Sequence, residues 1–200
     1  MIHVKTTRLK AAVKVHWEDT ILKPRALDEI KPYLEASQYQ HLLNTDKATF
    51  RFWGDTDNNK SIWEKMKIGD LILFYGNNRF HAKGYVESTF ENDELAKYFW
   101  PDFNEAGPLK NIYTIKNLTG LDVLFKDVKK YFKRQDGKPR QADVFRGSAA
   151  LNNTQVDQGF LDLIRVQRDV GLLGGSLERQ FKKLYGTDSF KKRFSKKLRI

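Results

Sequence analysis

Apolar and polar residues in the first quarter of the chain follow two different periods. Val13, Val15 and Trp17 alternate with polar residues, and this period of two predicts a half-buried first strand. After Pro24, apolar residues recur at helical spacing with Pro32 inside the run, so we expect a short or kinked helix followed by another turn or two. These helices are expected to cover one face of a sheet.

Strand patterns dominate the middle of the chain. Residues 50–53 alternate between apolar and polar side chains, and residues 72–75 and 80–86 form two apolar-rich runs on either side of Asn77-Asn78. A two-residue loop of this kind between two strand patterns predicts a β-hairpin. Residues 111–115 predict one more strand.

Helical patterns with polar residues at their starts lie between and after these strands. The predicted helices and their caps are residues 62–66 after Asn59 or Ser61, 91–99 with an acidic start, 123–132 after Asp122, and 156–164 after Asn153 or Thr154. Strands and helices mixed in this way predict an α+β core.

Length and charge divide the chain into a folded part and a tail. Two hundred residues are enough for one domain with a sizeable core, and we assign residues 1–168 to it. Glycines between positions 171 and 175 indicate a linker, and residues 174–200 carry nine Lys/Arg against two acidic residues. We therefore assign residues 169–200 to a Gly-containing linker and a basic helical tail, which holds most of the net charge of +11.

The composition limits the function classes. The net charge and a pI near 9.7 favour a polyanionic partner, and the sequence has no apolar run of 18 residues, so nucleic acid is favoured over a membrane. Zero cysteines exclude disulfides, thiolate metal sites and a cysteine nucleophile, and they permit a reducing compartment. The first residues lack the apolar segment of a secretory signal, and we expect a cytoplasmic protein.

Enzyme signatures are weak in this sequence. The segment from Gly171 lacks the Gly-Lys-Ser/Thr ending of a phosphate-binding loop, and the four histidines have no spacing that fits zinc or a Ser-His arrangement. Asp102 followed by Asp136 and Lys138 resembles the acid-acid-lysine set of metal-dependent nucleases, but Asp136 lies in a polar loop and not in an apolar strand. We expect no catalytic residue, no metal site and no cofactor, with a metal-dependent nuclease as the lowest alternative.

Two of the four tryptophans stand at the ends of predicted elements. Trp53 precedes Gly54-Asp55 and Trp100 precedes Pro101-Asp102, and side chains in such loops often face a cleft. Most of the other aromatic residues are expected in the core, because each buries a large apolar area. The two tryptophans are therefore the candidates for an aromatic binding site.

The segment that starts at Trp53 has a distinctive order. Trp53 is followed by an Asn before a short helix, by Gly69-Asp70, by an apolar strand that ends in Phe74-Tyr75, and by residues 80–87. The order continues in residues 99–101, 107, 111–115 and 145–148. Over about residues 10–166 the chain resembles the YTH and EVE branch of the PUA-like superfamily.

This resemblance implies a fold, a ligand and partners. The fold is expected to be a small curved mixed β-barrel flanked by helices, and the ligand a methylated base held in an aromatic cage. Domains of this branch stand at the N-terminus of McrB-like subunits of modification-dependent restriction systems, ahead of a GTP-driven motor. We therefore expect a recognition domain for double-stranded DNA that flips a methylated base out of the helix, and we expect this base to be N6-methyladenine. The expected further partners are an AAA+ GTPase motor domain and a nuclease subunit. The alternative within this fold is an RNA-binding domain for methylated adenine in single strands.

The resemblance also implies the walls of the cage. Trp53 and Trp100 match the two cage tryptophans of YTH relatives, and Asn58 or Asn59 matches the Gly-Asn step of the family, although the Gly is absent. The third wall has two candidates, Phe103 and Leu109.

Stacking and one methyl group give too little selectivity, so polar contacts are expected as well. The candidates for hydrogen bonds to the base edge are Asp55, Asn58, Asn59 and Asp102. The basic residues expected to hold flanking phosphates are Lys60, Arg79, Lys83, Lys110, Arg134, Lys138, Arg140 and Arg146.

Overall fold

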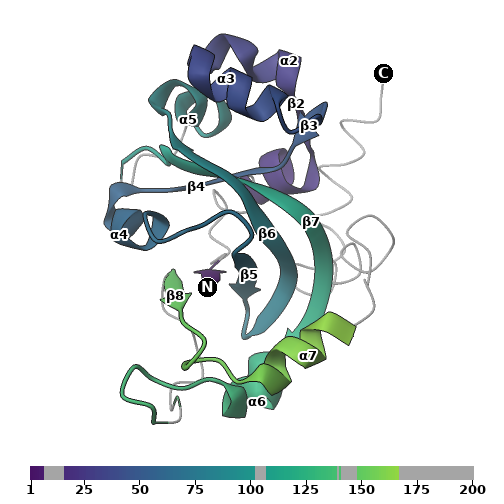
Figure 1. The fold of residues 1–200 in the computed structure, drawn as a ribbon, viewed down its shortest axis with the longest axis vertical. Helices are drawn as coiled ribbons and strands as arrows, with labels where there is room; N and C mark the ends of the chain where they lie inside the picture. The colour runs from purple at the N-terminus through teal and green to yellow at the C-terminus, as the bar shows by residue number, and fades with distance from the viewer. Residues whose placement is uncertain (7–15, 102–106, 139, 141–147, 167–200) are drawn as a thin grey trace, which may run out of the picture.

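A curled six-stranded sheet forms a half-barrel at the centre of the molecule, with helices at both ends (Figure 1). The computed structural model describes residues 1–6, 16–101, 107–138, 140 and 148–166. The sheet has the order β4-β7-β6-β5-β1-β8, and β2 and β3 form a separate two-stranded ribbon. The strands are β1 Ile2–Thr6, β2 Arg25–Ala26, β3 Thr49–Phe50, β4 Phe52–Asp55, β5 Leu71–Gly76, β6 Arg79–Glu91, β7 Asn111–Leu124 and β8 Ala149–Leu151.

The helices are short, and most of them have one or two turns. They are the π-helical turn η1 Trp17–Leu22, α2 Leu27–Ile30, η2 Lys31–Tyr33, α3 Ala36–Leu43, η3 Asp57–Asn59, α4 Lys60–Trp63, α5 Asp93–Phe99, α6 Phe125–Val128, η4 Lys129–Tyr131 and α7 Gln158–Val166. Helices of this length are marginal in water by themselves, so packing of their apolar faces must stabilise them.

The sheet is built around the β5–β6 hairpin. Asn77 and Asn78 both have positive φ, 48° and 60°, which is the backbone of a type I′ turn and which asparagine tolerates better than most residues. β6 and β7 pair antiparallel along their whole length, and β1 adds to β5 in parallel. The hairpin predicted from the Asn-Asn pair is confirmed.

The pairing of β6 with β7 is interrupted by bulges. The register between them shifts at three places along β6, between Phe80 and Ala82, between Lys83 and Tyr85, and between Val86 and Ser88. Each shift changes which side chains point inward and increases the local twist. The long strands therefore curl into a half-barrel.

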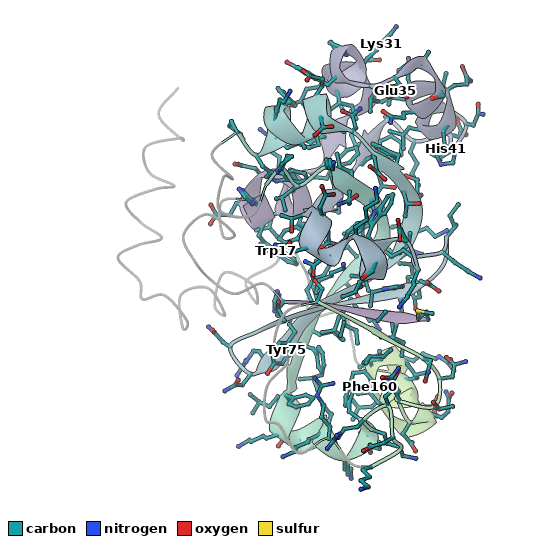
Figure 2. The ribbon with its side chains drawn as sticks, turned by 90° about the vertical axis from the view of Figure 1, so that its left-hand side faces the viewer. Trp17, Lys31, Glu35, His41, Tyr75 and Phe160 are labelled. Carbon is teal, nitrogen blue, oxygen red and sulfur yellow. The ribbon has the colours of Figure 1, made fainter. Side chains whose placement is uncertain are left out.

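Three groups of buried side chains make up the core. The interior cluster fills the half-barrel, the cap cluster lies between the sheet and the helices α2, α3 and α5, and the α7 cluster lies between the sheet and α6 and α7. Figure 2 places Phe160 of the α7 cluster at one end of the molecule, and Lys31, Glu35 and His41 of the cap helices at the other. The main aromatic members are Trp17, Trp53, Phe74 and Tyr113 inside, Phe52, Phe99 and Trp100 in the cap, and Phe80, Phe125, Phe132 and Phe160 around α7.

Several predicted elements differ from the observed ones. Trp17 begins η1 and is not the end of a strand, whereas Val13 and Val15 lie outside the described residues. Asp122 is not a helix cap, because β7 continues through it to Leu124. The last helix begins at Gln158, after Asp157, whose Oδ1 accepts a hydrogen bond from Gly159 N at 2.8 Å.

The predicted fold class is confirmed. The molecule is α+β, with a curved mixed sheet and flanking helices. The helical run divided at Pro32, the strands after Phe50 and the helix that ends at Phe99 all form, with Arg51 separating β3 from β4.

Candidate nucleic-acid interface

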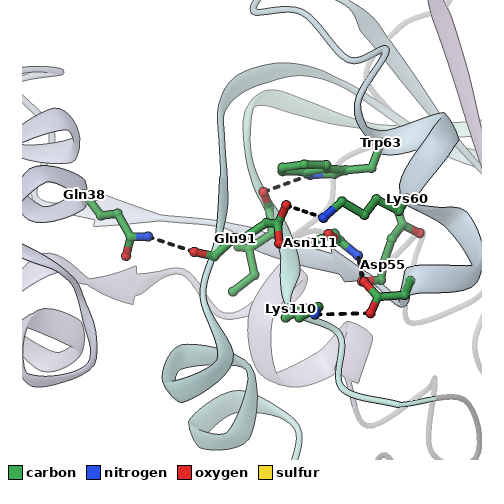
Figure 3. Close-up of polar contacts among 9 residues, drawn as sticks. Gln38, Asp55, Lys60, Trp63, Glu91, Lys110 and Asn111 are labelled. Atoms are coloured by element: carbon green, nitrogen blue, oxygen red, sulfur yellow. Dashed lines mark hydrogen bonds and ion pairs between the residues drawn. The ribbon is translucent and has the colours of Figure 1, made fainter.

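Three of the candidate base-binding residues, Asp55, Asn58 and Asn59, lie where β4 ends and η3 and α4 follow, beside the start of β7. We call this region the site end. Asn111 Nδ2 donates to the backbone oxygen of Asp55 at 3.1 Å and to Asp57 Oδ1 at 3.2 Å, and Trp63 Nε1 donates to Ile112 O at 3.1 Å (Figure 3). These contacts hold η3 and α4 against the start of β7.

Trp53 lies inside the half-barrel. Its side chain is 8% exposed, and its ring centroid lies 5.9 Å from that of Trp17 and 5.7 Å from that of Phe74. Both contacts are edge-to-face arrangements, which aromatic pairs in cores favour. η1 thus covers Trp53 from the inside of the barrel.

Trp100 lies on the other face of β4. It is 3% exposed, belongs to the cap cluster, and has ring contacts with His16 at 6.0 Å and with Phe99 at 5.4 Å. A Cβ atom on Gly54 would lie 2.8 Å from Trp100 Cζ3, so the absence of a side chain at this position allows the indole to approach the strand.

Trp53 and Trp100 therefore do not form two facing walls in this conformation. Side chains of adjacent strand residues point to opposite faces, and Trp100 packs where the side chain of Gly54 would point. At the start of η1, His16 contacts Trp100 and Trp17 contacts Trp53, so each tryptophan has a different neighbour.

The remaining base-binding candidates are distributed unevenly. Asn58 is exposed and Asn59 half-buried on η3, and Leu109 is half-buried with its backbone oxygen against Gly54. Asp102 and Phe103 lie outside the described residues.

Asp55 is committed to an interior ion pair that the sequence patterns did not predict. Lys5 Nζ contacts Asp55 Oδ2, and the side chains are 1% and 5% exposed. The ammonium also lies 5.3 Å from the ring centroid of Tyr113, whose pKa burial raises well above its ordinary value, with a further contribution from Asp55. Because Lys5 is on β1 and Asp55 on β4, this pair links two strands that are far apart in the sheet order.

Four buried polar groups on or near the two tryptophans have no hydrogen-bond partner among the described residues. They are the donors Trp17 Nε1 and Trp100 Nε1, the acceptor Asn111 Oδ1 and the hydroxyl of Tyr113. The ring of Trp100 packs on Gly54 through Cζ3, and Asn111 binds the backbone oxygen of Asp55 through Nδ2, so both side chains contact the end of β4. Buried polar groups are nearly always satisfied, so a ligand or a water molecule is expected to complete them.

Most of the cations predicted to hold phosphates have partners within the chain. Lys60 contacts Glu91 at 2.7 Å and Lys110 contacts Asp57 at 3.1 Å, both at the site end (Figure 3). The hydrogen bonds from Asn111 and Lys110 lower the pKa of Asp57.

Other predicted phosphate contacts lie far from the site end. Arg79 pairs with Asp122, Lys83 donates to Ile164 O, and Arg134 lies 3.5 Å from Asp136. Lys138 is exposed, Arg140 is half-buried with a pKa lowered by burial, and Arg146 lies outside the described residues. The structure therefore does not bring the seven described members of this set together.

Within the described ranges, no group of three or more His, Asp or Glu side chains could hold a metal ion. Asp136, one of the acids of the nuclease alternative, is exposed at a turn, where its Oδ1 accepts from Lys138 N at 3.1 Å. In the same part of the chain, no helix is long and apolar enough to cross a membrane.

Two solved structures share this architecture. The N-terminal domain of McrB from Thermococcus gammatolerans, bound to m5C DNA, matches with a TM-score of 0.61 at 18% identity over 82% of this chain and 96% of that one. The YTH domain of the Zygosaccharomyces rouxii MRB1 protein, in complex with N6-methyladenosine RNA, matches with a TM-score of 0.50 at 14% identity over 84% and 89%. This chain has the YTH-like fold.

The YTH-like fold confirms the resemblance inferred from the order of motifs. No family model and no curated protein matches the sequence, so the likeness is one of structure. Because one fold hosts several functions, the YTH-like architecture by itself does not assign a ligand. The ligand has to be argued from the site.

Proposed function

We propose that this chain is a recognition domain for double-stranded DNA that takes a methylated base out of the helix and binds it at the site end, with N6-methyladenine as the expected base. The observation that carries the proposal is the set of unpartnered buried groups on and near the two tryptophans, which includes the donor Trp100 Nε1 and the acceptor Asn111 Oδ1. One donor and one acceptor match a base edge that offers an amino N–H beside a ring nitrogen. Adenine and cytosine both have such an edge.

The neighbours in structure support a methylated nucleic acid as the ligand class. The McrB domain was solved with m5C DNA and the YTH domain with N6-methyladenosine RNA. The two ligands differ in base and in sugar, and both contain a methylated base. The choice between N6-methyladenine and 5-methylcytosine is therefore made by the binding experiment below.

Flipping a base costs a few kcal/mol in lost stacking and pairing. Stacking on an aromatic side chain returns about 1–3 kcal/mol, and burial of one methyl group adds about 0.8 kcal/mol. The sum is close to zero, so hydrogen bonds to the base edge have to supply further affinity and the discrimination between bases. Polar groups such as Asn111, which no sequence motif indicated, are therefore important for base binding in this proposal.

Base binding between the two tryptophans also requires a change at η1. Trp53 and Trp100 are 8% and 3% exposed, and His16 and Trp17 cover one ring each. We expect the start of η1 to move when the base enters, and tryptophan fluorescence should report this movement because Trp17 and Trp53 are in contact.

The test is binding, at fixed moderate salt, to otherwise identical duplexes that carry adenine, N6-methyladenine, cytosine or 5-methylcytosine. We expect a preference for one methylated duplex that is lost in Trp53→Ala and in Trp100→Ala. Asn111→Ser should reduce the preference through loss of the free acceptor.

Buried tryptophans stabilise the fold, so a destabilised control is needed. Phe160→Ala removes a fully buried ring from the α7 cluster and should cost a similar amount of stability, about 3–5 kcal/mol. At a temperature where all variants remain folded, Phe160→Ala should keep the methyl preference. Equal binding to all four duplexes by the wild type would contradict the proposal.

The second candidate is the recognition of methylated adenine in single-stranded RNA. The match to a YTH domain in complex with N6-methyladenosine RNA favours it. A single strand needs no flipping, so it would be bound more tightly than the duplex with the same sequence and methyl group.

The proposal assigns binding, and not catalysis, to this chain. In a modification-dependent restriction system, cleavage would require an AAA+ GTPase motor domain and a nuclease subunit as partners. The match over 96% of the McrB N-terminal domain supports this context. Pull-down of a GTPase of this class from the native host by the tagged protein would test the assignment.

A further inference from the structure

The positive charge of the described residues is concentrated at one end of the molecule. Seven Lys/Arg and two Asp occur in residues 125–140, which form α6, η4 and the turn that follows. The cap segments at the other end, residues 25–47 and 91–99, contain four Lys/Arg and seven Asp/Glu. In Figure 1, α6 lies at the opposite end of the long axis from α2, α3 and α5. We call residues 125–138 and Arg140 the basic lobe.

Four lysines of the basic lobe have no carboxylate partner among the described residues. Among the described residues, none of four exposed lysines has a carboxylate within ion-pair distance. These are Lys126, Lys130, Lys133 and Lys138. By contrast, Lys60 and Lys110 at the site end are each paired with a carboxylate, at 2.7 and 3.1 Å. The unbalanced field therefore lies at the basic lobe, away from the predicted cage.

The backbone under these lysines is fixed by the core. Phe125 and Phe132 are fully buried, and Phe132 forms a β-bridge with Val156. Lys133 N donates to Gln155 O at 2.8 Å, and Arg134 N donates to Lys138 O at 2.7 Å around a turn at Gly137, where φ is +78°. The hairpin thus presents its cations on a rigid base, which reduces the entropy lost when they bind a partner.

We propose that the basic lobe is a docking surface for the phosphate backbone of duplex DNA, separate from the site end. The choice of DNA as the polyanion rests on the proposed function. The four exposed lysines without a carboxylate partner attract a polyanion strongly, whereas paired cations such as Lys60 and Lys110 must first give up their carboxylates. The contact is independent of base identity and methylation, because phosphates carry no sequence information.

The experiment compares two variants with the same change in charge. Lys133→Gln/Lys138→Gln removes two cations from the basic lobe, and Lys31→Gln/Lys97→Gln removes two exposed lysines from the cap end. Binding of the full chain to a methylated and to an unmethylated duplex is measured from about 50 to 200 mM salt. Lys133→Arg/Lys138→Arg keeps the charges and serves as the rescue variant.

The expected result is a lower salt dependence in the lobe variant only. Each phosphate contact contributes about 0.9 to the slope of log K against log salt, so the slope should fall by about 1.8 and binding should weaken at least roughly tenfold at low salt. The ratio of affinities for methylated and unmethylated duplex should not change, and the arginine variant should bind like the wild type.

The outcomes separate this inference from the proposed function. A lobe variant that keeps the wild-type slope, or that loses no more than the cap variant, overturns the docking surface. A reduced slope in a protein without any methyl preference would support the docking surface and overturn the methylated-base proposal. Failure of the wild type to bind either duplex overturns both.

Discussion

Lys5 and Asp55 are the residues whose environment departs most from the usual behaviour of charged side chains. Both are buried, and they contact each other across the interior of the half-barrel. The Coulomb attraction of such a pair roughly offsets the cost of removing two charges from water, so the pair adds little stability in total. Removal of only one of the two side chains is strongly destabilising, because the remaining charge is then buried without a partner.

We expect Lys5→Met to destabilise the protein by about 3–5 kcal/mol in urea unfolding, because Asp55 is left unpaired. The double variant Lys5→Met/Asp55→Leu should recover most of this loss. Lys97→Met, which breaks an exposed pair with Glu94, should cost less than about 1 kcal/mol. A double variant no more stable than Lys5→Met would show that the pair does not act as a unit.

His81 gives the fold a dependence on pH. Burial lowers the pKa of His81 to about 4, with a further contribution from Arg79. The folded state therefore keeps the ring neutral while the unfolded chain takes up a proton near pH 6.5. The free energy of unfolding should fall as the pH is lowered from about 6.5 towards 4, and the contribution should be fully present above 6.5.

The slope from one proton is at most about 1.4 kcal/mol per pH unit. His81→Gln should flatten the profile between pH 4 and 6.5 when unfolding is followed at several pH values. A variant with the same pH profile as the wild type would assign the dependence to other groups.

Residue-scale features of the site were the hardest to predict. The partners of Asn111 and Lys5 are Asp55 and Asp57, about fifty positions away in the chain, so no local pattern indicates them. Trp53 and Trp100 were recognised from motif order, but their placement on opposite faces of β4 follows from Gly54 and the sheet. Their role as cage walls stays a prediction.

At the scale of elements, the Asn77-Asn78 turn was predictable because its backbone is set by local sterics. Both residues have positive φ, where asparagine is tolerated and alanine is strained. We expect Asn77→Ala/Asn78→Ala to cost about 1–2 kcal/mol per residue, measured by chemical unfolding. Asn44→Ala, at a position with φ of −67°, should cost much less. Equal losses in both variants would contradict this explanation.

β7 was predicted too short because its length depends on the neighbouring strand and not on local sterics. The polar segment after Ile115, which includes Asn117 with φ of 51°, has the composition of a strand end. In the sheet this segment is absorbed by the irregular pairing with β6, and the strand continues to Leu124. Asp122 then pairs with Arg79 of β6 instead of capping a helix. Bulges depend on the neighbouring strand, so a single strand pattern does not reveal them.

At the scale of the whole molecule, the curved sheet with flanking helices was predicted from motif order and is confirmed. The sequence patterns did not predict β1, where His3 and Lys5 alternate with Ile2 and Val4. A period of two would place those polar residues in water, whereas both are buried. Their partners are Asp70 and Asp55, which come near only when the sheet has formed. The distribution of charge likewise depends on pairs such as Lys60–Glu91, which the fold creates.

The predicted boundary after residue 168 can be tested by removing residues 169–200. The last described helix ends at Val166, and its buried residues, Phe160 and Ile164, lie before the boundary. Removal of residues 169–200 should therefore shift Tm by less than about 2 °C, since no buried apolar residue of the described core is lost. The nine Lys/Arg of residues 174–200 are removed as well, so binding to every duplex should weaken and its salt dependence should fall.

The methyl preference should survive this truncation, because it is assigned to the site end and not to the charge of the chain. Thermal unfolding and the four-duplex binding series, each performed on the shortened and the full chain, measure the two effects separately. A fall in Tm of more than about 5 °C would place part of residues 169–200 in the fold. Loss of the methyl preference with an unchanged Tm would instead make the tail part of the base-binding site.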